Sequence, residues 1–163
     1  MTSRVTLFKN IKETETPFYR DVDIVLQRIK NGASKHLVKK IRTTKNKTER
    51  NELKKMLPAI CFSGIFNKRQ DSAISEHSGL ICLDFDGYDK KKLLLEHKEK
   101  LVKDKYVYSV FISPSGNGLK ALIKIPPTTE NHISYFNSLK RYFDSPQFDK
   151  TCKNVSRVCY ESY

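Results

Sequence analysis

Long hydrophobic runs are missing from this sequence of 163 residues. No apolar stretch approaches the ~20 residues that a helix needs to cross a bilayer. The N-terminal residues also lack the apolar segment of a secretory signal peptide. The sequence therefore predicts an intracellular, cytoplasmic protein with no membrane partner.

Paired cysteine motifs are missing as well. The four cysteines are widely separated, and none forms a CxxC pair, which argues against a zinc ribbon or a dithiol redox motif. Because three of them lie among apolar neighbours, we expect buried free thiols in a reducing compartment and no disulfide. The four cysteines are Cys61, Cys82, Cys152 and Cys159.

Acidic residues are scarce relative to basic ones. The 18 Asp and Glu residues stand against 31 Lys and Arg, which gives a formal net charge of +13. Such a positive surface favours polyanions, with nucleic acid first and an anionic membrane second. Residues 35–55 form the most basic segment, and whether it contacts phosphate or is only a solvated helix stays open.

Against this basic background, the most apolar run of the chain ends in two carboxylates. Leu80–Leu83 is typical of a strand that is buried on both faces. Asp84 and Asp86 follow two residues apart, so they lie on the same face, with their backbone origins roughly 6.6 Å apart. Their oxygens could converge on one hard divalent cation. A helix is predicted over 89–103, so the chain forms a strand-loop-helix unit. The pair then lies at the carboxyl end of the strand, where ligands gather in open α/β sheets.

Periodicity predicts the elements that surround this strand. A chain of this length with 38% hydrophobic residues is long enough for one domain with a two-layer core. We expect strands over 4–8 (at a sheet edge), 59–63, 106–112 and 119–125, a polar linker over 70–76, helices over 21–30 and 89–103, a helix cap at Thr48, and a last helix from Thr128 or Thr129 to Pro146. In the helix over 89–103, the side chains expected to face inward are Leu93, Leu94, Leu95, His97 and Leu101.

A small polar loop separates the last two predicted strands. Its two glycines permit backbone conformations in which successive N–H groups point at an anion, and two serine hydroxyls and a lysine stand beside them. The loop would then be a phosphate cradle. Its Asn-Gly pair is also the strongest short signal for a tight hairpin turn, which needs no ligand. The candidate phosphate-binding residues are Ser113, Ser115, Gly116, Asn117, Gly118 and Lys120.

Asp149 is a third candidate carboxylate. It stands alone among apolar and basic neighbours in the C-terminal segment, ahead of Lys150, Lys153 and Arg157. A loop aspartate is also typical of a helix cap or of a surface charge. Its proximity to Asp84 in the folded chain would therefore decide between these interpretations.

Three short motifs, taken in their order, resemble the archaeo-eukaryotic primase (PrimPol) superfamily. They are LDFD at 83–86, SPSGNGLK at 113–120 and FDKTCKNVSRVCYESY at 148–163. More closely, they resemble the primase-like N-terminal domain of VirE-type proteins from bacterial mobile elements and phages. The resemblance extends from about residue 59 onward. It implies an α+β fold with an RRM-like primase/polymerase core, a mixed or antiparallel sheet flanked by helices, joined to a smaller α/β subunit.

The resemblance also implies a function. Members are metal-dependent nucleotidyltransferases of the primase/DNA polymerase type, here in replication of a mobile element or phage. Asp84, Asp86 and Asp149 would be the catalytic, metal-binding residues for Mg²⁺ or Mn²⁺, because nucleotidyl transfer uses two cations roughly 3.5 to 4 Å apart. Arg157 would either contact phosphate or pair with a carboxylate. The implied partners are a nucleotide triphosphate, a single-stranded nucleic-acid template, and a helicase-like module in the same or a partner chain.

The sequence departs from the superfamily at one position. The middle motif usually has the form Ser-x-His, and Lys120 stands where the histidine is expected, as in the VirE-type pattern. A protonated lysine can hold phosphate as a point charge. Two alternatives therefore stay open: a catalytically inactive nucleic-acid-binding or replication-initiation module, and a metal-dependent nuclease. The sequence stops inside an apolar and aromatic run, so we expect a single primase-like domain over 1–163 at the N-terminus of a longer chain.

Overall fold

Every residue of strand β6 is buried, and the apolar run Leu80–Leu83 predicts this for its first four residues. The computed structural model describes residues 3–163 and places β6 in a three-stranded antiparallel sheet with the order β6-β8-β7. Because alternate side chains point to opposite faces, the strand contributes to two separate parts of the core. The strands of this sheet are β6 (Leu80–Phe85), β7 (Val107–Ile112) and β8 (Leu119–Lys124).

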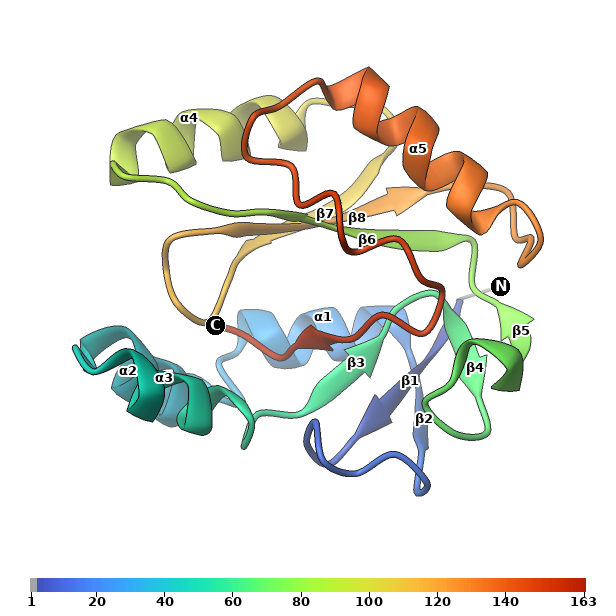
Figure 1. The fold of residues 1–163 in the computed structure, drawn as a ribbon, viewed down its shortest axis with the longest axis horizontal. Helices are drawn as coiled ribbons and strands as arrows, with labels where there is room; N and C mark the ends of the chain where they lie inside the picture. The colour runs from blue at the N-terminus through green and yellow to red at the C-terminus, as the bar shows by residue number, and fades with distance from the viewer. Residues whose placement is uncertain (1–2) are drawn as a thin grey trace.

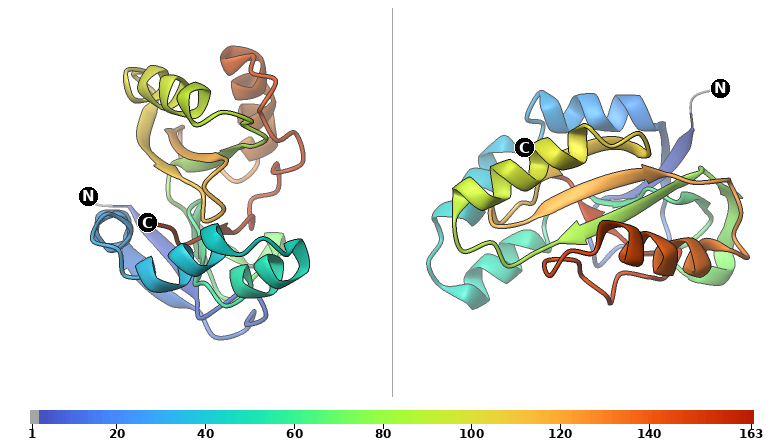
Figure 2. Two further views of the ribbon diagram at one scale, coloured as in Figure 1. Left: turned by 90° about the vertical axis from the view of Figure 1, so that its left-hand side faces the viewer. Right: turned by 90° about the horizontal axis from the view of Figure 1, so that it is seen from above.

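Two helices, α4 (Lys91–Val102) and α5 (His132–Phe143), cover one face of this sheet (Figure 1). The odd-numbered side chains of β6 share an apolar core with both helices. Figure 2 shows the two helices on the same side of the strands, with the second layer of the molecule on the other side. The even-numbered Leu80 and Cys82 face that second layer.

The second layer is a four-stranded antiparallel sheet in the order β2-β1-β3-β9, together with helix α1. The apolar side of α1 and the strands β1 and β3 pack against the inner face of the β6-β8-β7 sheet. Burial of this apolar surface from both layers holds them together. The elements are β1 (Arg4–Phe8), β2 (Phe18–Asp21), α1 (Val22–Lys30), β3 (Ala59–Cys61) and β9 (Cys159–Tyr160).

The basic segment forms a helical hairpin of α2 (Lys35–Thr43) and α3 (Lys47–Lys54), which extends from the second layer (Figure 1). Val38, Ile41 and Leu53 hold the two helices together. Most of the remaining side chains face solvent, as expected for such a charged segment. Between β3 and β6, the chain forms a short two-stranded sheet of β4 (Gly64–Phe66) and β5 (Ile74–His77). The 3-10 helix η1 (Asp71–Ala73) lies between these two strands.

The C-terminal segment returns to the free edge of β6. Strands β6 and β7 both run antiparallel to β8, so they are parallel to each other, and α4 connects them. After α5, Phe148 forms an antiparallel bridge with Phe85. The chain then crosses to the second layer, where β9 pairs with β3. The C-terminal segment therefore contacts both sheets.

The fold confirms the α+β class, with helices and antiparallel sheets. It also confirms the strands at 4–8, 106–112 and 119–125, the helix at 21–30, and four free, buried cysteines. No helix within residues 3–163 is both long and apolar enough to cross a bilayer.

Two predictions about strands are wrong. Strand β1 does not lie at an edge, because β2 and β3 pair with its two sides. The segment 70–76 is not a linker throughout, since it contains η1 and most of β5. Strand β5 has four residues, partly exposed, so it lacks the apolar alternation by which strands are recognised.

The starts of two helices were also predicted wrongly. Asn46, not Thr48, caps α3, and its side chain accepts a hydrogen bond of 3.0 Å from the third N–H of the helix. Helix α5 begins at His132, later than a cap at Thr128 or Thr129 would place it. Several polar residues that can cap a helix precede each one, and sequence alone does not choose among them.

The inward face of α4 is narrower than predicted. Leu94 and Leu101 are buried, whereas Leu93 and Leu95 are exposed. Successive helical residues are about 100° apart, so three consecutive leucines cannot all face one core. The two exposed leucines leave an apolar surface on the outside of this helix.

Candidate metal centre

Asp84 and Asp149 are neighbours although 65 positions separate them in the chain. The backbone N–H of Asp149 donates to the carbonyl of Asp84 at 2.8 Å, and the N–H of Asp86 donates to the carbonyl of Gln147 at 2.8 Å. These bonds flank the bridge between Phe85 and Phe148. The C-terminal segment thus lies along the end of β6 and brings the third predicted carboxylate to the first.

The Cys152 thiol joins these two carboxylates. It donates to Asp149 Oδ2 at 2.9 Å and to Asp84 Oδ2 at 3.4 Å. One ligand atom from each of the three residues lies within 4.8 Å of the others. Burial, followed by the charge of Asp84 and the hydrogen bond to Asp149, raises the pKa of the thiol, which therefore acts as a donor. Sequence reasoning missed Cys152, because all four cysteines were interpreted as buried free thiols without a role in the site.

A tight local turn fixes the orientation of Asp149. The N–H of Thr151 donates to Asp149 Oδ1 at 2.9 Å, and its hydroxyl donates to the same oxygen at 2.7 Å. Burial alone would raise the pKa of Asp149, but the bonds from Cys152 and Thr151 and the charge of Arg157 together lower it. The Asp149 carboxylate is therefore ionised at neutral pH and offers its Oδ2 to the centre.

Asp86 lies at the rim of this centre and is exposed. Its carboxylate lies against Gly118, where an added Cβ would overlap Asp86 Oδ1 and come within 2.9 Å of the Phe85 carbonyl. A glycine at position 118 thus allows the Asp86 carboxylate and the Phe85 carbonyl to lie close to the backbone of the polar loop. Desolvation raises the pKa of Asp86, and the charges of Asp84 and Asp149 add to this effect, while nearby lysines oppose it. The charges of both other carboxylates act on Asp86. Asp86 does not belong to the group of Asp84, Asp149 and Cys152, whose ligand atoms lie within 4.8 Å of one another.

Lys120 forms an ion pair with Asp84, its cross-strand partner in the β6–β8 register. Only 11% of the Lys120 side chain is exposed, and Asp84 is 6% exposed as a residue. Burial alone would lower the pKa of Lys120. The charge of Asp84 and the neighbouring thiols of Cys159 and Cys82 outweigh that effect and raise it. Lys120 is therefore protonated, and its charge is directed at a carboxylate.

The polar loop is a compact turn beside the rim. The N–H of Gly116 donates to the Ser113 carbonyl at 2.9 Å, and the N–H of Ser113 donates to the Gly118 carbonyl at 2.8 Å. Gly116 adopts a φ of 81°, so the tight turn falls at 113–116 rather than at Asn117-Gly118. Arg42 of α2 donates to the Ser113 carbonyl at 3.2 Å. Two of the predicted cradle N–H groups are thus satisfied within the loop, and Ser115 Oγ lies 3.5 Å from Ser113 Oγ.

Arg157 approaches the centre from the C-terminal segment. Its Nη2 lies 3.9 Å from Asp149 Oδ2. Its Nε is buried and finds no hydrogen-bond partner within residues 3–163. The guanidinium is therefore only partly used by the protein.

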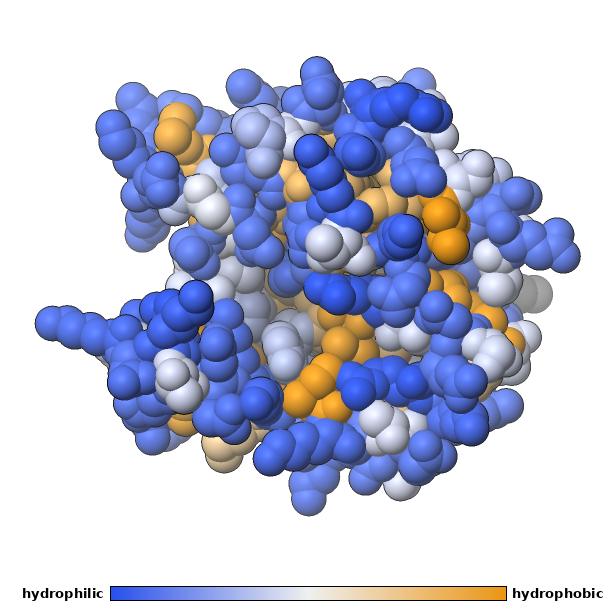
Figure 3. All heavy atoms as spheres, viewed as in Figure 1, coloured by the Kyte–Doolittle hydropathy of each residue, from blue (hydrophilic) through white to orange (hydrophobic). Residues whose placement is uncertain are grey.

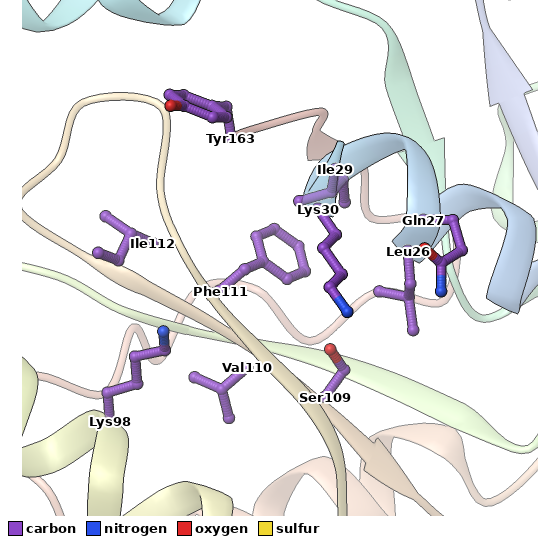
Figure 4. Close-up of a pocket in the computed structure, with 10 residues that line it drawn as sticks. All are labelled: Leu26, Gln27, Ile29, Lys30, Lys98, Ser109, Val110, Phe111, Ile112 and Tyr163. Atoms are coloured by element: carbon purple, nitrogen blue, oxygen red, sulfur yellow. The ribbon is translucent and has the colours of Figure 1, made fainter. Parts of the chain in front are cut away.

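A separate cavity of about 410 Å³ lies between α1 and the edge strand β7 (Figure 4). Lys30 of α1 and Lys98 of α4 lie on the two sides of β7, and Leu26 and Phe111 lie on the same side as Lys30. Among residues 3–163, its lining includes none of the predicted site residues and no acidic side chain. The carboxylate side chains that could bind a metal therefore lie in the centre at the end of β6 and not in this cavity.

The chain belongs to the family described as "BT4734-like, N-terminal domain", which matches residues 52–163. This range contains β6, the polar loop and the C-terminal segment, and therefore every residue of the centre. No curated protein and no solved structure matches the chain.

Proposed function

We propose that this protein is a metal-dependent nucleotidyltransferase of the primase/DNA polymerase type, which uses nucleotide triphosphates and a single-stranded template. The observation that carries the proposal is the meeting of Asp84 and Asp149, with Asp86 at the rim. Carboxylates from distant parts of the chain meet here against their mutual repulsion, which a divalent cation would offset. A helicase-like module, in the same or a partner chain, would supply the opened template.

The topology supports an RRM-like primase core. With the 147–149 segment beside β6, the strand order becomes segment-β6-β8-β7, and the elements follow one another as β-α-β-β-α-β. This is the split β-α-β arrangement that RRM domains use. The layer of β1, β2, β3, β9 and α1 then corresponds to the smaller α/β subunit. Asp84 lies on the face of the β6-β8-β7 sheet that is turned toward this smaller subunit, as Leu80 and Cys82 do.

The donor set fits the proposed ions. Asp84, Asp86 and Asp149 supply the hard oxygens that Mg²⁺ and Mn²⁺ prefer. If a metal displaced the Cys152 thiol proton, the resulting thiolate would favour Mn²⁺, the softer of the two ions. When bound, such ions would increase the nucleophilicity of a 3′-hydroxyl and neutralise triphosphate charge. The protein itself contributes the ionised state of Asp149 through Thr151, and the rim position of Asp86 over Gly118.

An extension assay tests the proposal. Purified protein with a single-stranded template, a primer, labelled nucleotides and Mn²⁺ or Mg²⁺ should give extended products. Asp84→Asn, which keeps the shape of the side chain, should reduce product at least ~100-fold, because a ligand that carries charge is lost. The matched control is Asp89→Asn at an exposed position beyond the strand. Equal activity of Asp84→Asn and wild type would refute the assignment.

The ion pair of Lys120 with Asp84 favours a second candidate, a catalytically inactive nucleic-acid-binding module. In that case the lysine permanently neutralises the carboxylate that a metal would need. Salt-sensitive binding of single strands with no product under either metal would select this candidate.

A further inference from the structure

The outer edge of strand β7 has no strand beside it. Strand β8 pairs with one side of β7, and within residues 3–163 no strand pairs with the other side. The N–H of Ser113 donates to the Gly118 carbonyl, so these two residues form a hydrogen-bonded pair of the ladder. Because such pairs alternate along antiparallel strands, the backbone N–H and C=O groups of Val110 and Ile112 point outward. The Ser162 hydroxyl donates to the Ile112 carbonyl at 2.6 Å, which agrees with this direction.

This outward edge borders the cavity of about 410 Å³ (Figure 4). Residues 109–112 of β7 line it in succession, and Leu26 and Ile29 of α1 add apolar side chains. Four residues of a strand extend over roughly 13 Å, at about 3.3 Å per residue. An unpaired strand edge of this kind is a template on which another extended chain can pair. The cavity therefore leaves space for a segment in β conformation beside β7.

A lysine lies on each side of this edge. Lys30 of α1 and Lys98 of α4 are on opposite sides of β7 (Figure 4). In the part of the chain that the structure describes, neither lysine forms an ion pair, and the cavity lining contains no acidic residue. Alternate side chains of an added strand point to opposite faces. One acidic side chain on each face could therefore meet one lysine.

A peptide strand suits this edge better than nucleic acid or a second copy of the chain. The outward edge offers both donors and acceptors, and a peptide backbone complements both, whereas phosphates only accept hydrogen bonds. Phe111 is 8% exposed, and the Tyr163 ring lies against Lys35 and Arg42, so the lining offers little aromatic surface for stacking bases. A second copy would bring another net charge of +13, and the face in Figure 3 is largely hydrophilic.

We propose that the edge of β7 binds an extended peptide segment of a partner protein, with apolar residues in its middle and an acidic residue toward each end. The segment pairs with the outward backbone groups of Val110 and with the Ile112 N–H as an added strand. Its acidic side chains pair with Lys30 and Lys98. The site shares no residue with the carboxylate centre, so this proposal does not depend on the metal-dependent function.

Fluorescence anisotropy with the labelled peptide Glu-Val-Ile-Thr-Val-Glu tests the proposal, because its two glutamates lie on opposite faces of a strand. The variant K30E/K98E should weaken binding at least ~10-fold and should instead bind Lys-Val-Ile-Thr-Val-Lys. The control K39E/K91E makes the same change of charge at exposed helical positions outside the cavity, and should bind within about twofold of wild type. Thermal unfolding verifies that each variant is folded.

Two further measurements test the backbone pairing. The same acidic peptide with N-methyl groups on its four central residues keeps its charge but loses its donors, so it should not bind. Hydrogen exchange measured by NMR should show slower exchange of the Val110 and Ile112 amides when the unmodified peptide is bound. Protection of these two amides, together with loss of binding in K30E/K98E alone, supports the proposal.

Other outcomes overturn it. Equal weakening in K30E/K98E and K39E/K91E, or equal binding of the N-methylated peptide, would show that charge alone attracts the peptide. Absence of binding by wild-type protein also refutes the proposal. Protection of the same two amides by single-stranded oligothymidylate, with no protection by the peptide, assigns the edge to nucleic acid instead. None of these results depends on whether the protein extends a primer.

Discussion

The two faces of strand β6 carry different chemistry. On the face toward α4 and α5, Ile81, Leu83 and Phe85 are apolar without exception. On the face toward the second layer, Leu80 and Cys82 are followed by the Asp84–Lys120 ion pair. Adjacent residues of one strand thus serve separate purposes, one face for stability and one face for the candidate centre. Substitutions one position apart should therefore destabilise the protein for different reasons, lost packing on one face and an unpaired charge on the other.

The largest effect on stability should come from the helix-covered face. The Phe85 ring lies 4.9 Å from His97, 5.5 Å from Phe148 and 6.0 Å from Phe143, centroid to centroid. Phe85→Ala should lower the free energy of unfolding by about 3 to 5 kcal/mol, measured by urea denaturation. Phe18→Ala, at a residue that is 50% exposed, is the control and should cost less than ~1 kcal/mol. Similar losses for both would mean that this face is not the principal core.

On the opposite face, the stability should depend on pairing rather than on packing. Asp84→Ala strands the buried Lys120 ammonium and should cost about 3 kcal/mol in the same unfolding experiment. Asp84→Ala combined with Lys120→Met removes both charges and should recover at least about half of that loss. A double variant no more stable than Asp84→Ala would show that the ion pair does not set the cost.

A neutral pair at the start of β6 should make stability pH-dependent. His77 Nε2 lies 3.0 Å from His132 Nδ1, and the N–H of Gly79 donates to His77 Nδ1. Burial, with a smaller contribution from His77 and against the nearby Asp71, lowers the pKa of His132 from 6.5 to about 4. The unfolded chain therefore binds more protons below pH 6.5. Stability should be complete above pH ~6.5 and fall by at most ~3 kcal/mol as pH drops toward 4.

Urea midpoints at pH 7 and pH 4.5 measure this effect. His132→Gln should flatten the dependence, because the group with the lowered pKa is gone. His36→Gln, at an exposed position, should leave the slope as in wild type. A wild-type slope in His132→Gln would assign the acid sensitivity to other groups.

The smallest effect should be a change in metal preference at the carboxylate face. Cys152→Ser keeps a donor to Asp84 and Asp149 but replaces sulfur with oxygen. Mn²⁺ affinity should fall several-fold while Mg²⁺ affinity changes little, since a thiolate formed by metal displacement of the Cys152 proton favours the softer ion. Calorimetric titration with each metal measures the ratio. Cys61→Ser is the control, because that thiol contacts the Ser156 carbonyl instead, and an identical ratio in both variants would exclude sulfur from the centre.

The elements that could be predicted from the sequence are those whose pattern lies within a short stretch of the chain. An apolar run identified β6, and one-sided periodicity identified α1. The ion pair between Asp84 and Lys120 was not predictable, because it depends on the register of β6 against β8. Asp149 was proposed from its neighbours in the sequence and from its motif, while Cys152 joins the two carboxylates only after the C-terminal segment lies along β6. Residues whose partners are distant in sequence carry little local evidence of their role.

The path of the C-terminal segment has a consequence for the order of events in the cell. Residues 147–149 lie along β6, and residues 159–160 extend the other sheet. During synthesis, β6 leaves the ribosome well before either contact can form, and domains acquire long-range contacts late. A nascent chain thus holds Asp84 and Asp86 without Asp149. The group formed by Asp84, Asp149 and Cys152 is therefore complete only after the C-terminal segment has packed along β6.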